Sequence, residues 1–302
     1  MGKATKTWLI IGICLILAGV LLLGNALYML RWDFSKLFTT KFNTNSYVPD
    51  SNFQDITIMT DTADVEFLPS DKCKVVCYEP ENMTHHVTVS DGTLRIEVND
   101  TRKWYEQISL FSPYQKITVY LPEGEYGALS VQADTGDVKL PAGYHFESAV
   151  ITLDTGDILV ENSSAKAMTL SASTGKITLN HAVCEGDLQV EVSTGKTILS
   201  DSSCKNLSAT GDTGDIALNR VNATEKISIE RTTGDVNFDS CDAKEIFVQT
   251  DTGSVKGSLL SEKIFIAESD TGWVNVPDSV SGGKCEIRTD TGNIHITVAK
   301  EQ

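Results

Sequence analysis

Asp134-Thr135-Gly136-Asp137-Val138 is a pentapeptide that returns eight more times, in near copies, before the chain ends. Self-similarity at a fixed period is typical of solenoids, propellers and arrays. The threonine and the glycine are present in all nine copies, which stand 19 or 20 residues apart: Thr135-Gly136, Thr155-Gly156, Thr174-Gly175, Thr194-Gly195, Thr213-Gly214, Thr233-Gly234, Thr252-Gly253, Thr271-Gly272 and Thr291-Gly292. The sequence therefore predicts a repeat architecture, although nothing in it names a substrate.

The residues on both sides of each glycine alternate between apolar and polar types. The second and fourth positions after the glycine are mostly Val, Ile or Leu, and so is the fifth position before it. A period of two is the signature of a strand with one buried face, and short coils bury such faces only by stacking. Residues 127–298 are therefore predicted to form an all-β fold, a single-stranded parallel β-helix (β-solenoid), expected to be right-handed, of about nine coils.

The threonine and the glycine that recur in every copy have structural explanations. Threonine suits a pleated surface, and stacked hydroxyl groups can bond along a ladder of strands. Glycine is expected at a corner that requires positive φ, where a Cβ would cost energy. We interpret both columns as structural turn residues.

The chain before the repeats is predicted to contain a cap and a linker. Asp61-Thr62-Ala63-Asp64-Val65 is a degenerate copy with alanine in the glycine position, which we interpret as an atypical capping coil. Short runs rich in β-branched and aromatic residues continue to residue 126, so residues 51–126 are predicted to be a β-rich N-terminal cap. Residues 31–50 are polar and turn-rich, and we interpret them as a linker or stalk.

Residues 8–30 carry no formal charge. A helix of this length, at ~1.5 Å per residue, spans a hydrocarbon core of ~30 Å. We predict an uncleaved single-pass membrane anchor, with residues 1–7 as a cytoplasmic tail and the bulk of the chain extracytoplasmic. A cleaved signal peptide is the alternative, but the apolar run is longer than a typical signal core and lacks a clear Ala-x-Ala site.

The charge balance argues against nucleic acid as a partner. The 302 residues include 25 Lys and Arg against 41 Asp and Glu, a formal net charge of -16. Nucleic-acid affinity comes largely from basic side chains that neutralise phosphates. An acidic exterior instead favours solubility beside a membrane, or cation binding.

Asp-Thr-Gly is also the active-site triplet of aspartic proteases, in which two copies face each other and share a proton. A solenoid lines its copies up along one edge, so proteolysis is not expected. A polysaccharide-active β-helix enzyme is a further alternative, but these coils are too short and uniform for the long loops that would build a groove. We predict no catalytic residue and no cofactor.

Calcium is a more serious alternative. Aspartates two before and one after the glycine could present oxygens between coils, and the candidate ligands are Asp134, Asp137, Asp154 and Asp157. The middle coils carry Lys176 and Lys196 instead, which stacking would place beside Asp157 and Asp215. Such cross-strand ion pairs would relieve repulsion between stacked carboxylates, so we favour a structural, charged edge over a calcium site.

Cysteine and histidine spacings offer little chemistry. Cys184 and Cys204 each follow a repeat glycine by nine residues and should stack on adjacent coils, either bridged or, as we favour, as free thiols. Cys73 and Cys77 have no second ligand pair, so zinc is not expected. His85 lies near a turn, with no carboxylate or cysteine at an evident ligand spacing.

Two places depart from the repeat and are candidates for partner contact. Residues 101–114 are the most aromatic loop-like stretch, with Trp104, Tyr105, Phe111 and Tyr114, and they either cover the first coil or form a binding lip. Trp273 interrupts the charged column that follows the glycines. It is either an exposed contact residue or part of a distal cap.

The alternating strands around Asp-Thr-Gly-Asp, preceded by Ile117-Thr118-Val119-Tyr120-Leu121-Pro122, resemble the bacterial β-strand-repeat family labelled "putative adhesins", a domain of unknown function. The resemblance covers roughly residues 51–298. It implies a single-stranded parallel β-helix and brings no catalytic residues. We therefore expect a membrane-anchored, non-catalytic interaction or scaffold module, in adhesion or envelope sensing, whose partner is an envelope protein or a surface glycan; a calcium-dependent binding module is the alternative.

Overall fold

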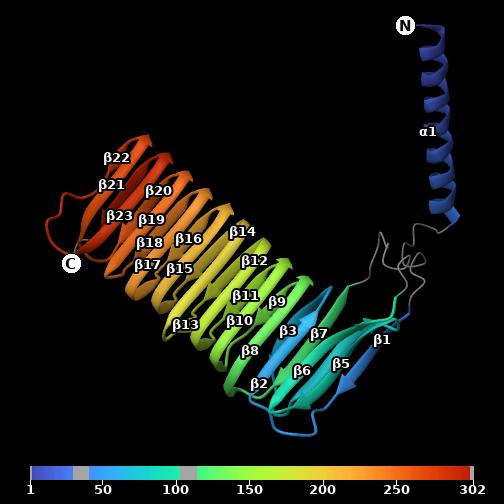
Figure 1. Ribbon diagram of the computed structural model, residues 1–302, viewed down its shortest axis with the longest axis horizontal. Helices are drawn as coiled ribbons and strands as arrows, with labels where there is room; N and C mark the ends of the chain where they lie inside the picture. Colours follow the sequence, from blue (N-terminus) through green and yellow to red (C-terminus); the bar gives the residue numbers. More distant parts are fainter. Residues whose placement is uncertain (1, 30–40, 103–113, 300–302) are drawn as a thin grey trace. The chain divides into compact units, whose positions relative to one another are not determined.

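The computed structural model describes residues 2–29, 41–102 and 114–299. Two units are distinguished, residues 1–41 with 102–113 and residues 42–101 with 114–302. The described part of the first unit is the helix α1 (Lys3–Met29; Figure 1). Within it, Trp8–Met29 is long and apolar enough to cross a membrane, as the sequence predicts, and a signal sequence would meet the same criterion.

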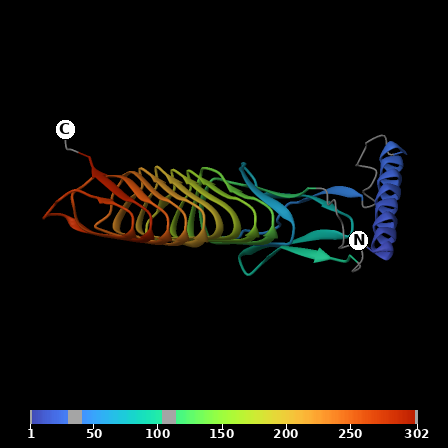
Figure 2. The same ribbon diagram turned by 90° about the horizontal axis from the view of Figure 1, so that it is seen from above.

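The second unit is the predicted β-solenoid, whose coils stand side by side like ribs in Figures 1 and 2. Each coil contributes a strand to two long ladders. The first ladder consists, in spatial order, of β5 (Met83–Ser90), β6 (Thr93–Asp100), β2 (Asp55–Thr60), β8 (Gly124–Thr135), β10 (Tyr144–Thr155), β12 (Ser164–Asn180), β14 (Asp187–Ser200), β15 (Ser203–Thr213), β17 (Asn222–Thr233), β19 (Glu245–Thr252), β23 (Gly283–Thr291) and β21 (Lys263–Thr271).

The second ladder follows the same stack on an adjacent side. The long strands β12 and β14 turn the corner and belong to both ladders, while β13 (Val183–Cys184) lies on a third side. The remaining members, in spatial order, are β1 (Phe42–Tyr47), β4 (Lys74–Pro80), β7 (Gln115–Leu121), β3 (Ala63–Pro69), β9 (Val138–Leu140), β11 (Ile158–Glu161), β16 (Ile216–Asn219), β18 (Val236–Cys241), β20 (Val255–Leu259), β24 (Ile294–Val298) and β22 (Val274–Asn275).

The predicted stacking of the copies is confirmed by the strand register. Thr155 pairs with Thr135 on one side and with Thr174 on the other, and Thr194 pairs with Thr213. The apolar columns point inward and form one continuous core along the stack. Gly156 has φ of 145°, and the other repeat glycines except Gly253 also have the positive φ predicted at the corner.

Aromatic side chains fill the core near the N-terminal end of the stack. Tyr126, Tyr144 and Phe146 have ring centroids 5.9 to 6.3 Å apart. The Tyr126 hydroxyl donates to the Pro122 carbonyl oxygen at 2.6 Å, so its polar end is satisfied.

The N-terminal end differs from the prediction in two ways. The predicted linker, residues 31–50, contains β1, which pairs antiparallel with β4 and so belongs to the folded unit. The degenerate copy at residues 61–65 does not end the stack, because Ile56 in its coil pairs with Leu129 on one side and with Leu94 on the other. The strands β6 and β7 therefore form one coil beyond it, and part of the predicted cap continues the solenoid.

The last two coils are exchanged relative to their order in the sequence. The strand β19 pairs with β23, and β21 pairs with the other side of β23, so the coil that comes later in the chain is inserted inside. Its inward side chains Cys285, Ile287 and Ile294 are fully buried, whereas Phe265 in β21 is only half-buried. The later coil therefore contributes its side chains to the core, and the earlier coil closes the stack.

Candidate functional site

The aspartates after the glycines form a ladder between coils. Asp64 Oδ1 accepts a hydrogen bond from the backbone N–H of Asp137, Asp137 Oδ1 from that of Asp157, and Asp157 Oδ1 from that of Lys176, each at 2.8 Å. At this corner the strands are interrupted, and each carboxylate accepts the backbone N–H that a carbonyl oxygen would accept within a strand ladder. Their role there is structural, because an unpaired backbone N–H would cost free energy.

At Lys176 and Lys196 the corner is part of a continuous strand rather than a break between two strands. Lys176 pairs directly with Lys196, and β12 and β14 run through the corner without a break. Lys176 Nζ lies 3.5 Å from Asp157 Oδ2, and Lys196 Nζ lies 3.2 Å from Asp215 Oδ2, which confirms both predicted ion pairs. Because the partners are about half exposed, each pair contributes little stability, roughly 0–1 kcal/mol.

The calcium candidates are not gathered into a site. Asp134 and Asp154 are exposed, while one oxygen each of Asp137 and Asp157 already accepts a backbone N–H. Within the described ranges, no three acidic, histidine or cysteine side chains at this corner have ligand atoms within 4.8 Å of one another. Calcium dependence stays the alternative to the favoured structural role.

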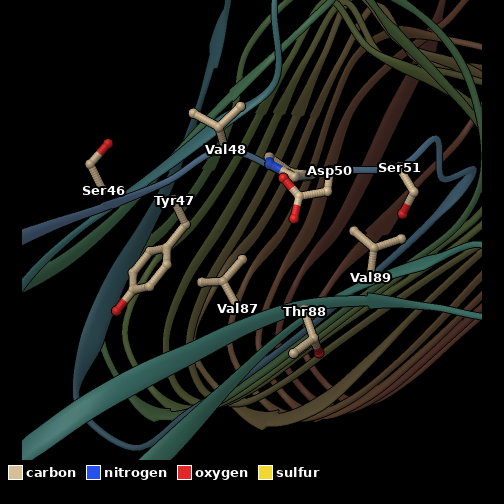
Figure 3. Close-up of a pocket in the computed structure, with 9 residues that line it drawn as sticks. Ser46, Tyr47, Val48, Asp50, Ser51, Val87, Thr88 and Val89 are labelled. Atoms are coloured by element: carbon tan, nitrogen blue, oxygen red, sulfur yellow. The ribbon is translucent and has the colours of Figure 1, made fainter.

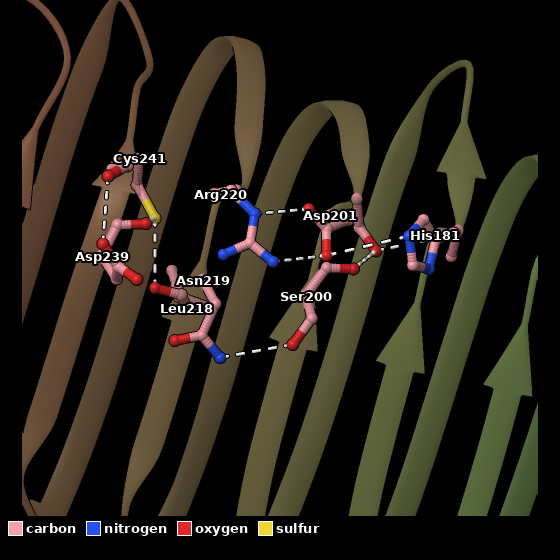
Figure 4. Close-up of polar contacts among 11 residues, drawn as sticks. His181, Ser200, Asp201, Leu218, Asn219, Arg220, Asp239 and Cys241 are labelled. Atoms are coloured by element: carbon pink, nitrogen blue, oxygen red, sulfur yellow. Dashed lines mark hydrogen bonds and ion pairs between the residues drawn. The ribbon is translucent and has the colours of Figure 1, made fainter.

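A second corner, six residues after the repeat glycine in the middle coils, was not predicted from the sequence. Five successive coils place a non-glycine residue there at φ of 49 to 56°, in the left-handed region: Asn162, His181, Asp201, Arg220 and Ser240. Arg220 donates to both oxygens of Asp201, at 2.5 and 2.6 Å, and His181 Nε2 lies 3.8 Å from Asp201 (Figure 4). The varied residue types hid this column, although its spacing from the glycine is constant.

Arg231 is the buried cation of the first corner. Its Nε donates to the Gly214 carbonyl oxygen at 2.8 Å, its Nη1 to that of Val192 at 2.6 Å and its Nη2 to that of Gly195 at 2.9 Å. Burial lowers the pKa of this guanidinium, and the nearby Asp215 acts in the opposite direction. The side chain ties three coils together and has no free donor surface for a ligand.

Of the aromatic candidates, the structure describes two. Tyr114 is exposed, and its hydrogen bond to the Asp64 carboxylate, with partial burial, raises its pKa to about 12. Trp273 is 53% exposed, and its ring contacts that of His295 edge-on, with centroids 5.8 Å apart. Trp104, Tyr105 and Phe111 lie outside the described residues.

Trp273 belongs to the outermost coil, β21 with β22, which we call the terminal coil (residues 263–275). Ile264, Ile266 and Val274 of this coil are also exposed. Among the described residues, β21 pairs only with β23 and β22 only with β24, so the outer edge of each strand has no strand partner. An apolar surface beside open strand edges is suited to binding another chain.

At the opposite end of the stack, a cleft opens between the β1–β2 connection and β5 (Figure 3). Its lining includes Tyr47, Asp50 and the alternating Val87, Thr88 and Val89. This lining holds a single charged side chain, Asp50, so the cleft lacks the cluster of charged groups that a catalytic or metal site would require.

Beside this cleft, Cys77, Glu79 and His85 form a buried cluster, which corrects the expectation that His85 has no ligand-type neighbour. Burial opposes ionisation of Glu79, but hydrogen bonds from His85 and Asn45 outweigh it and hold the pKa of this carboxyl below its usual value. Burial, and then the charge of Glu79, raises the pKa of the Cys77 thiol to about 12. The fold of β4 against β5 creates the cluster, and the spacing alone did not suggest it.

The other cysteine pair matches the favoured prediction. Cys184 and Cys204 lie on adjacent coils, and both are buried, free thiols. Burial raises the pKa of Cys204 to about 12. They behave as core residues.

Several solved structures are similar to this chain. A "putative adhesin" from Bacteroides fragilis is 17% identical with a TM-score of 0.44, covering 85% of this chain and 97% of its own. A "putative adhesin" from Parabacteroides merdae is 10% identical with a TM-score of 0.47, covering 85% and 96%. A "putative lipid binding protein" from Parabacteroides distasonis is 13% identical with a TM-score of 0.49, covering 85% and 97%. These scores are too low to carry a function over.

Among curated proteins, none matches this chain in sequence. The sequence model of the family described as Toastrack DUF4097 matches residues 53–297, which is most of the chain. The matched range is nearly the range, residues 51–298, over which the sequence resembles the adhesin-like repeat family. The predicted resemblance is thereby confirmed, and the chain belongs to the Toastrack DUF4097 family.

Proposed function

We propose that this protein is a membrane-anchored, extracytoplasmic β-solenoid that serves as a non-catalytic interaction module, in adhesion or envelope sensing. The open terminal coil carries the proposal. The apolar helix α1 supports the anchor, and the net charge of -16 suits a domain held beside a membrane rather than on nucleic acid.

The terminal coil favours a protein partner over a glycan. The outer edge of β21 offers a row of backbone donors and acceptors, which an extended protein segment satisfies by adding a strand. Ile264 and Ile266 provide apolar contact next to that edge. A glycan would instead stack against the ring of Trp273. This residue lies just before β22, outside the strand β21.

Two polar features of the solenoid corner support a non-catalytic role. The aspartate ladder bonds backbone N–H groups, and Arg231 bonds backbone carbonyl groups. Both features hold coils together. Their atoms are therefore committed to the fold.

The contact is tested by placing a photo-crosslinking residue at position 266 of the full chain in its host cells. Val150 is the matched control, because it stands in the same column, six residues before a repeat glycine, and is 40% exposed against 41% for Ile266. We expect a defined protein to crosslink at position 266 and not at position 150. Crosslinks that are equal at both positions, or lacking at both, would contradict a docking role for the terminal coil.

Two variants separate the partner classes. With the photo-crosslinking residue moved to position 264, which is 44% exposed on the same strand, Ile266→Lys should abolish recovery of the crosslinked protein, whereas Val150→Lys should leave it unchanged. If Trp273→Ala abolishes binding of the solenoid to the surface of host cells while Ile266→Lys does not, the partner is a glycan. Membrane fractionation with protease added outside intact cells tests the anchor, since the solenoid should be digested while α1 stays in the membrane fraction.

A further inference from the structure

The strongest unexplained feature of the molecule is the buried cluster at the N-terminal end of the solenoid. Cys77 and Glu79 are two residues apart on β4, so their side chains point to the same side of the strand. His85 is on β5, after a short turn that carries the chain from the second ladder to the first. All three residues are buried, with at most 2% of their surface exposed.

The three side chains are close enough to share one ion. Cys77 Sγ, a Glu79 carboxylate oxygen and a His85 ring nitrogen all lie within 4.8 Å of one another. The shortest distance joins His85 Nδ1 to Glu79 Oε2, at 2.7 Å. Ligand bonds to zinc are about 2.0–2.3 Å long, so an ion among these atoms requires only small side-chain shifts.

A second set of side chains orients the first. His85 Nε2 lies 2.9 Å from Thr60 Oγ1, at the end of β2. Glu79 Oε1 accepts a hydrogen bond from Asn45 Nδ2 at 2.6 Å, from β1. Metal-binding histidines usually make such a hydrogen bond through their other ring nitrogen, which sets the tautomer, and ligand carboxylates are commonly hydrogen-bonded as well.

The donor types select the ion. One thiolate sulfur, one imidazole nitrogen and one carboxylate oxygen form a set that suits Zn²⁺, whereas Ca²⁺ and Mg²⁺ require oxygen ligands throughout. We propose that Cys77, Glu79 and His85 bind one zinc-class divalent cation, with the fourth coordination position left for water. On binding, the Cys77 thiol loses its proton to solvent, and the direct contact between Glu79 and His85 is replaced by bonds from each to the ion.

Such an ion would fasten the end of the solenoid. Its direct ligands come from β4 and β5, and the groups that orient them come from β1 and β2. These strands include the antiparallel pair β1 and β4, which lies outside the repeat. A bond network across them would stabilise the end that has no regular coil to cover it.

A buried structural ion pair is the competing explanation. The backbone N–H of His85 also donates to Glu79 Oε2, at 2.7 Å, so the carboxylate is satisfied without a metal. The two explanations differ at Cys77, which contributes nothing to the ion pair. Direct sulfur–metal bonding is therefore the decisive observable.

The test uses the full chain in detergent micelles, stripped of metal with a chelator and titrated with Co²⁺ under reducing conditions. We expect one equivalent to bind, with a sulfur-to-cobalt charge-transfer band that Zn²⁺ abolishes by competition. Cys77→Ser should lose the band. Cys285→Ser is the matched control, another fully buried free cysteine, and should keep it.

Two further variants keep the proposal testable if Cys77→Ser fails to fold. His85→Gln retains hydrogen-bonding capacity but should weaken Co²⁺ binding at least tenfold. Thr60→Val should weaken binding by about 10- to 100-fold while leaving the band in place at saturation. Thermal melting without metal checks that each variant folds.

The proposal is overturned if the wild-type chain shows no charge-transfer band at micromolar Co²⁺. It is also overturned if Cys285→Ser loses the band as Cys77→Ser does, or if folded His85→Gln binds as tightly as the wild type. In those cases the cluster is a buried ion pair beside an unrelated thiol.

Discussion

Gly211 leaves the space that the guanidinium of Arg231 fills on the neighbouring coil. The two residues pair in register, and a Cβ on Gly211 would lie 1.9 Å from Arg231 Nη1 and 1.9 Å from the Val192 carbonyl oxygen. The arginine reaches back to the carbonyl groups of two earlier coils, to Gly214 in one and to Val192 and Gly195 in the other. A glycine in one coil thus permits a buried cation in the next.

Arg231→Met should destabilise the solenoid by about 3 kcal/mol, because it leaves several buried carbonyl oxygens without their charged donor. The measurement is the free energy of urea unfolding of the full chain in detergent. Arg288→Met is the control, since Arg288 is half exposed and forms an ion pair with Glu286, and it should cost at most about 1 kcal/mol. Equal losses would show that the carbonyl contacts of Arg231 contribute nothing specific.

Thr197→Val should stabilise the chain by about 1–2 kcal/mol. Thr197 stands between Ile177 and Ile216 in an inward-facing column, and its buried hydroxyl has no hydrogen-bond partner. Removing an unsatisfied buried polar group recovers its desolvation cost. The melting temperature of the variant should rise by a few degrees.

Thr289→Val is the matched control for that substitution. Thr289 is as buried as Thr197, but its hydroxyl donates to the Gly253 carbonyl oxygen at 2.9 Å. The variant should therefore lose about 1 kcal/mol. Changes of the same sign in both variants would mean that side-chain shape, and not the hydrogen bond, decides the outcome.

Gly195→Ala should destabilise the solenoid by at least about 3 kcal/mol. A Cβ at this position would lie 1.7 Å from the Gly175 carbonyl oxygen, and φ is 141°, where side chains are strained. Gly92→Asn is the control, because its φ of 75° suits asparagine and nothing lies within 4 Å of a Cβ there. Unfolding free energies of the two variants are compared with that of the wild type.

Stability should depend on pH through Asp215. The hydrogen bonds from Lys196 and from the backbone of Asp235 lower the pKa of Asp215 below 3.8. A lowered folded-state pKa gives a contribution that is fully present above the unfolded pKa and is lost as the pH falls through the folded value. Wild type should therefore melt higher than Asp215→Asn at pH 7, and the difference should vanish toward pH 2.

Salt provides the check on that prediction. The carboxylate of Asp215 and the ammonium of Lys196 are both about half exposed, so part of the pH-dependent difference should shrink at high ionic strength. Lys196→Met should lose the same salt-sensitive part. A melting difference that is constant across pH and salt would contradict an electrostatic origin.

Much of the fold was predictable from the sequence because each coil repeats the same local pattern. The alternation around each glycine indicates which side chains are buried, and the constant period sets the register between coils. The ion pairs of Lys176 with Asp157 and of Lys196 with Asp215 follow from that register alone. The apolar helix before the repeats was likewise evident from its composition.

The candidate sites were less predictable, because they arise where the repeat ends or changes. The left-handed corner that holds Asp201 and Arg220 has a constant position but no constant residue type. The contact between Glu79 and His85 depends on how one turn packs between two ladders. Neither feature has a period or a motif to reveal it.

By itself, the sequence determined the coil: its length, its buried columns and the corner at each threonine and glycine, since these depend on residues close together in the chain. Only the tertiary structure decided the order of the last two coils, the pairing of β1 with β4 and the gathering of Cys77, Glu79 and His85. The reason is physical. Those features depend on which distant segments pack against one another, and contacts between distant segments follow from no local pattern.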